Sequence, residues 1–152
     1  MPVVLARKTL MPIQLLALDL EATLIDDAMN ANPRPGLYRF LSFCDESFPR
    51  VSLLTTVDED SAREVLEQLA ENRDAPSSLV DRIGYINWDR EFKDLRNVSG
   101  IALTDILFVD DDRGWIHPEQ LGQWIQIDAW HGGADEGLAR VQNVLTKRLL
   151  ST

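Results

Sequence analysis

Residues 13–20, IQLLALDL, form an almost unbroken apolar run that leads directly into further acidic sequence. Such a run is typical of a strand buried on both faces of a parallel sheet. Short apolar runs recur at 51–55, 83–88, 106–109 and 124–127, with helical patterns between several of them. Strands that alternate with helices predict a parallel sheet with right-handed crossovers. We therefore expect a three-layer α/β sandwich around a mainly parallel, Rossmann-like sheet.

Three segments have the apolar spacing of amphipathic helices. Pro35 stands where the first-turn proline of the first segment is expected. Asp58 or Asp60 is a candidate N-cap for the second, and Gly132, Gly133 and Asp135 are expected to open the third. The apolar positions are Leu37, Phe40, Leu41 and Cys44, then Ala62, Val65, Leu66, Leu69 and Ala70, then Leu138, Val141, Leu145 and Leu149.

The chain has 152 residues, the length of one ordinary domain of about 150 residues. We expect a single domain over 13–152, with residues 1–12 as a tail or an extra edge strand. The one cysteine, Cys44, predicts neither an intramolecular disulfide nor a cysteine-based zinc site. The sequence lacks an apolar run near the ~20 residues of a membrane span, and its first residues do not resemble a signal peptide. We expect a cytoplasmic protein.

The charge balance limits the partners that the protein can bind. The sequence has 15 Lys and Arg against 25 Asp and Glu, a formal net charge of -10. Such a chain repels phosphate backbones and anionic lipids, so we expect neither nucleic acid nor a membrane as a partner. Phosphate chemistry on this chain therefore needs a local cation, such as a metal ion.

Polar residues follow three of the predicted strands. Asp19 and Glu21 end the first run, Thr55 and its rival Thr56 follow the second, and residues 110–111, both aspartate, follow ILFV. Ligands of parallel α/β sheets bind outside the carboxyl ends of the strands. These side chains are therefore the candidate site residues.

Lys93 is the remaining candidate. The sequence has only three lysines, and every other cation from residue 9 to 146 is an arginine, which indicates a use for the compact ammonium of Lys93. Carboxylates gathered at one edge need a cation between them, and oxygen ligands suit Mg²⁺. A carboxylate beside the metal can attack phosphorus to form an aspartyl-phosphate. The hydroxyl of Thr55 and the ammonium of Lys93 would hold the phosphoryl group.

These residues, in this order, resemble the haloacid dehalogenase (HAD) superfamily of phosphohydrolases. LALDLEAT resembles its first motif, an apolar strand followed by Asp-x-Asp-x-Thr; Thr55, Lys93 and the pair Asp110-Asp111 resemble the other three. Four further segments resemble those of one branch of the superfamily, the NLI-interacting-factor-like proteins and small C-terminal-domain phosphatases. They are RPGLYRFL, FKDL, ILFVDD with a following HPE, and WIQIDAW. The similarity spans roughly residues 13 to 149.

The resemblance implies a HAD-like catalytic domain with Mg²⁺-dependent phosphatase activity. It makes Asp19 the nucleophile and a metal ligand, and it gives Glu21 two roles: the backbone carbonyl binds the metal and the side chain is the general acid/base. Asp111 is the expected second carboxylate ligand, while Asp110 either binds the metal through water or orients Lys93. Thr55 and Lys93 then grip the phosphate of a phosphorylated small molecule or phosphoprotein.

Two departures from the family pattern leave alternatives open. Glu21 replaces the family's second aspartate, and its extra methylene moves the carboxyl by about 1 Å, enough to cost ~100-fold in rate. A catalytically impaired pseudo-phosphatase, or a phosphate-binding regulatory module, is therefore the alternative function. Only residues 24–34 separate the first motif from the RPG segment. We expect no large cap domain and an open site, without the phosphoserine-peptide specificity of relatives that carry a longer insertion there.

Receiver domains of two-component systems also combine an acidic pair, an aspartate, a threonine and a lysine around Mg²⁺. In receivers the acidic pair follows the first strand and the lysine comes last, which is the reverse of the order here. We expect His117 and His131 to be structural, because neither has a paired ligand at metal spacing. Trp115 is a candidate pocket residue, and Arg34 is expected either to meet a substrate phosphate or to point to water.

Overall fold

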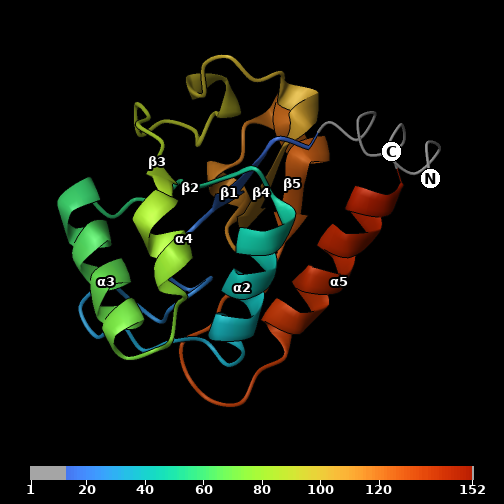
Figure 1. The fold of residues 1–152 in the computed structure, drawn as a ribbon. Helices are drawn as coiled ribbons and strands as arrows, with labels where there is room; N and C mark the ends of the chain where they lie inside the picture. The colour runs from blue at the N-terminus through green and yellow to red at the C-terminus, as the bar shows by residue number, and fades with distance from the viewer. Residues whose placement is uncertain (1–12, 152) are drawn as a thin grey trace.

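The computed structural model describes residues 13–151. At its centre is a five-stranded sheet in the order β3-β2-β1-β4-β5, and every pairing is parallel (Figure 1). The strands are β1 (Leu15–Leu18), β2 (Arg50–Leu53), β3 (Gly84–Tyr85), β4 (Ile106–Asp110) and β5 (Trp124–Gln126). The predicted parallel α/β fold is confirmed. The predicted tail or edge strand at residues 1–12 lies outside the described residues.

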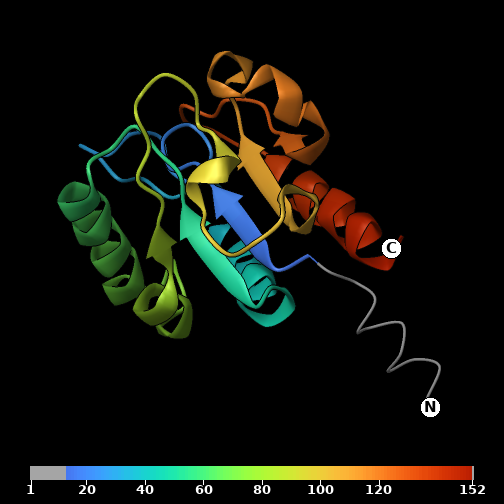
Figure 2. The same cartoon turned by 90° about the horizontal axis from the view of Figure 1, so that it is seen from above.

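The α-helices pack side by side against one face of the sheet (Figures 1 and 2). They are α2 (Leu37–Ser47), α3 (Glu59–Glu71), α4 (Ser77–Arg82) and α5 (Gly137–Leu150). The larger hydrophobic core lies between these helices and the sheet, where Leu16 and Leu18 of β1 meet Phe40 of α2 and Leu138 of α5. Cys44 is buried in this core, as its helical spacing predicted.

The opposite face of the sheet has a smaller core. Leu15 and Ala17 point to this face, because successive side chains of a strand alternate between the two faces. They pack near Leu95 of the 3-10 helix η1 (Leu95–Asn97) and near Ile116, which directly follows the 3-10 helix η3 (Arg113–Trp115). The third layer of the sandwich therefore consists of short 3-10 helices and loops.

Three element boundaries differ from the sequence-based prediction. Helix α2 begins at Leu37 and has Gly36, with a left-handed φ of 82°, as its N-cap, so Pro35 lies before its first turn. The strand predicted over 83–88 is only Gly84–Tyr85, because its partner β2 ends at Leu53, whose carbonyl accepts the last pairing bond from the N–H of Ile86. The last helix begins at Gly137 and not within 132–135, because the Asp135 carboxylate precedes it and accepts the Gly137 N–H.

The remaining helix findings concern the N-cap of α3, the short helix α4 and the prediction about membrane spans. The side chain of Asp58 accepts a hydrogen bond from the N–H of Ser61 and so caps α3, as one of the two predicted alternatives. Helix α4, only six residues long, was not predicted. Among residues 13–151, no helix is both long and apolar enough to cross a membrane.

The topology places the candidate site between β1 and β4. From β1 the chain crosses to β2 and then β3 on one side, and it returns to the other side of β1 to form β4 and then β5. The point where the strand order reverses is where open α/β sheets bind ligands, at the carboxyl ends of the strands. Asp19 directly follows β1, and Asp110 is the last residue of β4.

Candidate functional site

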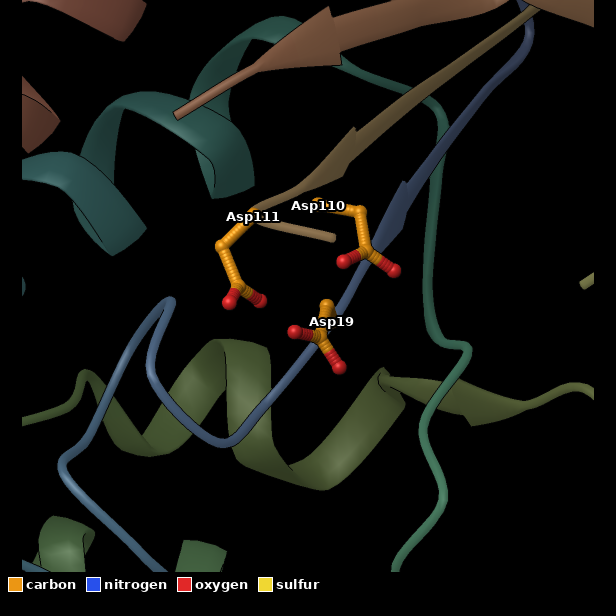
Figure 3. A group of neighbouring side chains, drawn as sticks. All are labelled: Asp19, Asp110 and Asp111. Atoms are coloured by element: carbon orange, nitrogen blue, oxygen red, sulfur yellow. The ribbon is translucent and has the colours of Figure 1, made fainter. Parts of the chain in front are cut away.

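Three aspartates meet at the carboxyl ends of β1 and β4 (Figure 3). The register pairs Leu18 with Val109, so the next residues, Asp19 and Asp110, lie side by side; the Asp19 N–H donates to the Val109 carbonyl at 3.0 Å. One carboxylate oxygen from each of Asp19, Asp110 and Asp111 lies within 4.8 Å of the others. The sequence-predicted carboxylates are therefore brought together by the parallel pairing.

Lys93 lies between two of these carboxylates. Its ammonium donates to Asp19 Oδ1 at 2.9 Å and to Asp110 Oδ2 at 2.6 Å. Only 2% of Lys93 and 5% of Asp19 is exposed, and Asp110 is fully buried. The Lys93 N–H donates to the Trp115 carbonyl at 2.8 Å, which fixes the loop that carries the lysine.

Thr23, the last residue of the first motif, links the two strand ends. Its hydroxyl lies 2.9 Å from Asp19 Oδ2 and 3.2 Å from Asp111 Oδ1. Each oxygen of Asp19 therefore has a donor, Lys93 on one and Thr23 on the other. This fixes the rotation of the Asp19 carboxylate.

The environment shifts the pKa values of the charged groups. Burial raises the pKa of Asp19 well above its ordinary value, against the attraction of Lys93. Burial likewise raises the pKa of Asp110 to about 6, again opposed by Lys93. Burial alone would lower the pKa of Lys93, but the neighbouring carboxylates of Asp19 and Asp110 raise it above its ordinary value. Lys93 therefore stays charged at neutral pH.

The donor set fits a hard divalent cation. When ionised, Asp19, Asp110 and Asp111 carry three negative charges around the single positive charge of Lys93. A buried excess of negative charge is costly unless a cation or protons balance it. Carboxylate oxygens are the ligands that Mg²⁺ prefers, and Mg²⁺ commonly keeps several waters beside one or two of them. The cluster is therefore a candidate magnesium site.

Glu21 is turned towards the loop that follows β1. Its Oε2 accepts a hydrogen bond from the N–H of Ala28 at 2.7 Å. The metal-site cluster contains the side chains of Asp19, Asp110 and Asp111 but not that of Glu21. The carboxylate of Glu21 thus contacts the loop after β1.

The two threonines after β2 differ in environment. Thr55 is fully buried, and its hydroxyl oxygen accepts a hydrogen bond from the Val57 N–H at 3.1 Å, whereas Thr56 is exposed. The indole N–H of Trp88 donates to the Thr55 carbonyl at 3.0 Å and so anchors this loop. Thr55 therefore has the more rigid surroundings of the two.

A tryptophan pair connects the loops that carry Thr55 and Lys93. The rings of Trp88 and Trp115 pack edge to face, with centroids 5.3 Å apart. Trp88 is bonded to the Thr55 carbonyl, and the Trp115 carbonyl accepts the Lys93 N–H. Trp115, a candidate pocket residue in the sequence, thus supports the loop of Lys93, and Trp88 is a neighbour that the sequence did not single out.

One buried ion pair was missed by the sequence-based reasoning. Arg34 is 1% exposed, so the prediction that it meets a substrate phosphate or points to water is wrong. It binds Asp135, 101 residues away in the chain, through two hydrogen bonds. His117 accepts the Glu119 N–H at the start of the 3-10 helix η4 (Pro118–Gln123), which agrees with a structural role.

Comparison with known proteins adds one finding. A family model described as NLI interacting factor-like phosphatase matches residues 14–151, which is nearly the whole chain. No curated protein matches the sequence. The matched range includes every site residue described above.

Proposed function

The chain belongs to the family of NLI interacting factor-like phosphatases, and on that premise we propose that it is a Mg²⁺-dependent phosphatase that hydrolyses a phosphomonoester through a phosphoryl group carried on Asp19. The observation that carries the proposal is the meeting of three carboxylates where β1 and β4 end, two of them, Asp19 and Asp110, bonded to the ammonium of Lys93. Family membership supports the phosphatase activity, and this geometry supports the metal and the nucleophile.

Asp19 and Asp111 would hold the Mg²⁺ ion, with the backbone carbonyl of Glu21 as the further ligand that the HAD resemblance implies. When bound, the ion polarises the phosphoryl oxygens and balances the negative charge of site and substrate. Asp110 is fully buried, and its Oδ2 accepts from Lys93 and its Oδ1 from the Asp112 N–H at 2.8 Å, whereas Asp111, the first residue of the loop, is partly exposed. We therefore assign to Asp110 the orientation of Lys93.

In the first step, a carboxylate oxygen of Asp19 attacks phosphorus and the bond from phosphorus to the leaving-group oxygen breaks. Glu21 supplies the proton that this leaving oxygen takes up. Lys93 and Thr23 hold the Asp19 carboxylate in one orientation, so that little freedom is lost on the way to the transition state.

In the second step, water attacks the phosphorus of the phosphorylated Asp19 and Glu21 takes a proton from that water. The bond between phosphorus and the Asp19 oxygen breaks, which releases phosphate and restores the carboxylate. The hydroxyl of Thr55 and the ammonium of Lys93 bind the phosphoryl oxygens and spread their charge in both steps. With the metal bound, the two proposed steps use only the side chains named above.

The position of Glu21 favours a second candidate function. Because its carboxylate is bonded to the Ala28 N–H, it is held by the loop and not by the metal cluster. A protein that keeps this arrangement with substrate bound would bind Mg²⁺ and phosphate without turnover. Mg²⁺ binding without hydrolysis would identify this pseudo-phosphatase.

The proposed substrate is a phosphorylated small molecule or a phosphoprotein. The segment from Thr23 to Arg34 forms a compact loop with isolated bridges between Glu21, Ile25 and Pro33, and it is too short to be a separate cap domain. Because a segment of this length cannot cover the site as a cap domain would, we propose that either kind of substrate can present its phosphate there.

The test is hydrolysis of p-nitrophenyl phosphate in Mg²⁺ and in EDTA by the wild type, Asp19→Asn and Asp112→Asn. Asp112 is the matched control, because it is the exposed neighbour of the acidic pair. We expect metal-dependent turnover by the wild type and Asp112→Asn and at least a ~100-fold loss in Asp19→Asn. Equal activity in Asp19→Asn, or a wild type that binds Mg²⁺ and is inert, would contradict the proposal.

A further inference from the structure

The environment of Arg34 is unusual for a residue outside the catalytic motifs. Its guanidinium is buried and makes four hydrogen bonds. Two go to the Asp135 carboxylate, at 2.7 and 3.1 Å. The other two go to the carbonyls of Ala22 and Thr23, both at 3.3 Å. Arg34 therefore ties the loop after β1 to the loop before α5.

We propose that Arg34 and Asp135 are a positioning pair that fixes the position of Thr23. Through the hydroxyl of Thr23, the pair also sets the orientation of the Asp19 and Asp111 carboxylates. This proposal rests on the proposed function for its kinetic consequence only. The connection is short: Arg34 donates to the carbonyl of Thr23, and the hydroxyl oxygen of the same residue lies within hydrogen-bond distance of both carboxylates.

The backbone around the pair is shaped for this arrangement. A Cβ on Gly137 would collide with the Arg34 guanidinium, so glycine at this position leaves room for the arginine. The Gly137 N–H donates to Asp135 Oδ2 at 2.8 Å, which holds the carboxylate against α5. The place of the guanidinium is thus defined by a helix that is anchored in the main core.

Ala22 gives a second reason why the loop needs external support. Its φ of 62° lies in the left-handed region, which L-residues other than glycine adopt at a cost. Its carbonyl accepts from Arg34 and from the Trp130 N–H at 2.9 Å. Both donors come from outside the strained turn, so they hold Ala22 in the conformation that brings Thr23 to Asp19.

Arg34 is a positioning residue and not a substrate ligand. Its donors point to Asp135 and to the two carbonyls, and burial keeps them from a phosphate in the site. A lysine could keep the charge opposite Asp135, but a single ammonium cannot reproduce the planar set of donors that spans both loops. Arg34→Lys therefore keeps the positive charge opposite Asp135 and removes the planar set of donors.

The chain offers a matched control at the opposite end of the sheet. Arg82 binds Asp45 at 2.7 Å and also donates to backbone carbonyls, those of Asp45, Phe48 and Pro49. These residues precede β2, so they lie at the amino end of the sheet and away from the site. Arg82→Gln removes an arginine that likewise links a carboxylate to backbone carbonyls, without changing the loop after β1.

The experiment compares wild type, Arg34→Lys, Asp135→Asn and Arg82→Gln at a temperature where denaturant curves show all four to be folded. The first measurement, made without metal, is the NMR shift of the carboxyl carbons of Asp19 and Asp111. The second is kcat and KM for p-nitrophenyl phosphate with Mg²⁺. We expect both carboxyl signals to move in the Arg34 and Asp135 variants, and kcat to fall 10- to 100-fold with KM within about threefold.

Arg82→Gln is expected to keep both carboxyl signals and kcat while it loses stability. The proposal is overturned if the carboxyl signals of Arg34→Lys and Asp135→Asn match those of the wild type. It is also overturned if their loss of kcat is no larger than that of Arg82→Gln. If the wild type shows no hydrolysis, the proposed function fails, and the carboxyl signals still decide whether the pair positions Asp19 and Asp111. If one variant does not fold, the other gives the same comparison.

Discussion

Lys93 Nζ lies 2.6 Å from Asp110 Oδ2, with at most 1% of either side chain exposed. Of the two roles that the sequence left open for Asp110, this pairing supports the orientation of Lys93 over a metal contact through water. Asp111 is then the proposed second carboxylate for the metal. The adjacent aspartates differ in environment because β4 ends between them: Asp110 is its last residue and Asp111 begins the loop.

The first prediction concerns the buried charge of Lys93. In metal-free protein at neutral pH, Lys93→Met leaves Asp19 and Asp110 buried without their cation, and we expect the free energy of unfolding to fall by about 3–5 kcal/mol. Denaturant unfolding measures it. Lys147→Met, in the last turn of α5 and exposed, is the control and should change nothing. A loss below ~1 kcal/mol in Lys93→Met would show that the carboxylates do not depend on this ammonium.

The second prediction concerns metal binding. A ligand that binds only the folded state stabilises it by RT ln(1 + [L]/Kd), about 2.7 kcal/mol at 100 times Kd. We therefore expect saturating Mg²⁺ to raise the free energy of unfolding of the wild type and of Asp112→Asn. In Asp111→Asn the effect should largely disappear. Equal stabilisation of all three proteins would place the ion elsewhere.

The third prediction tests Glu21 as the general acid. Glu21→Gln keeps an oxygen for the Ala28 N–H but cannot donate a proton to the leaving group. General acid catalysis is worth roughly 10²–10⁴-fold, and an alkyl alcohol needs it far more than a nitrophenol does. We expect kcat/KM for an alkyl phosphate to fall by that factor, with a much smaller loss for p-nitrophenyl phosphate. Equal losses for both esters would remove Glu21 from the acid role.

The fourth prediction is a pH dependence of stability. The hydrogen bonds from Arg34 hold the pKa of Asp135 below its ordinary value. A carboxylate whose pKa is lowered in the folded state stabilises the fold fully at pH values above its unfolded-state pKa of about 3.9. This stabilisation is lost as the pH falls through the folded-state pKa. Asp135→Asn should therefore cost about 3–5 kcal/mol at pH 7, and its deficit should shrink below about pH 4.

The measurement for this prediction is the free energy of unfolding of wild type and variant from pH 3 to 7. Asp128→Asn is the control, because Asp128 pairs with Arg140 at 3.8 Å on an exposed surface. Such a pair contributes about 0–1 kcal/mol, so its difference from the wild type should stay small throughout. A deficit of Asp135→Asn that does not change with pH would contradict an ionised Asp135 as the stabilising partner.

The sequence was sufficient to predict the residues that follow a strand. Asp19 and the pair Asp110-Asp111 follow runs buried on both faces, and parallel pairing necessarily brings such strand ends to one edge. Lys93 could be predicted because lysine is rare in this chain. The end of β3 could not be predicted, because it depends on the residue at which its partner β2 ends.

Contacts between distant loops were also beyond sequence reasoning. Arg34 and Asp135 are 101 residues apart, and neither local periodicity nor motif spacing connects them. The hydrogen bond between Glu21 and the Ala28 N–H likewise depends on the fold of the loop after β1.

The central claim is that Asp19 carries the phosphoryl group. Wild type and Glu21→Gln, in excess over p-nitrophenyl phosphate with Mg²⁺, would be quenched on the millisecond scale and reduced with borohydride, which converts an aspartyl-phosphate to homoserine. Peptide mass spectrometry then locates the modified residue. We predict homoserine at position 19, with more in Glu21→Gln because the attack of water on the phosphorylated Asp19 is slowed. Release of phosphate with an unmodified residue 19 in both proteins would contradict the account.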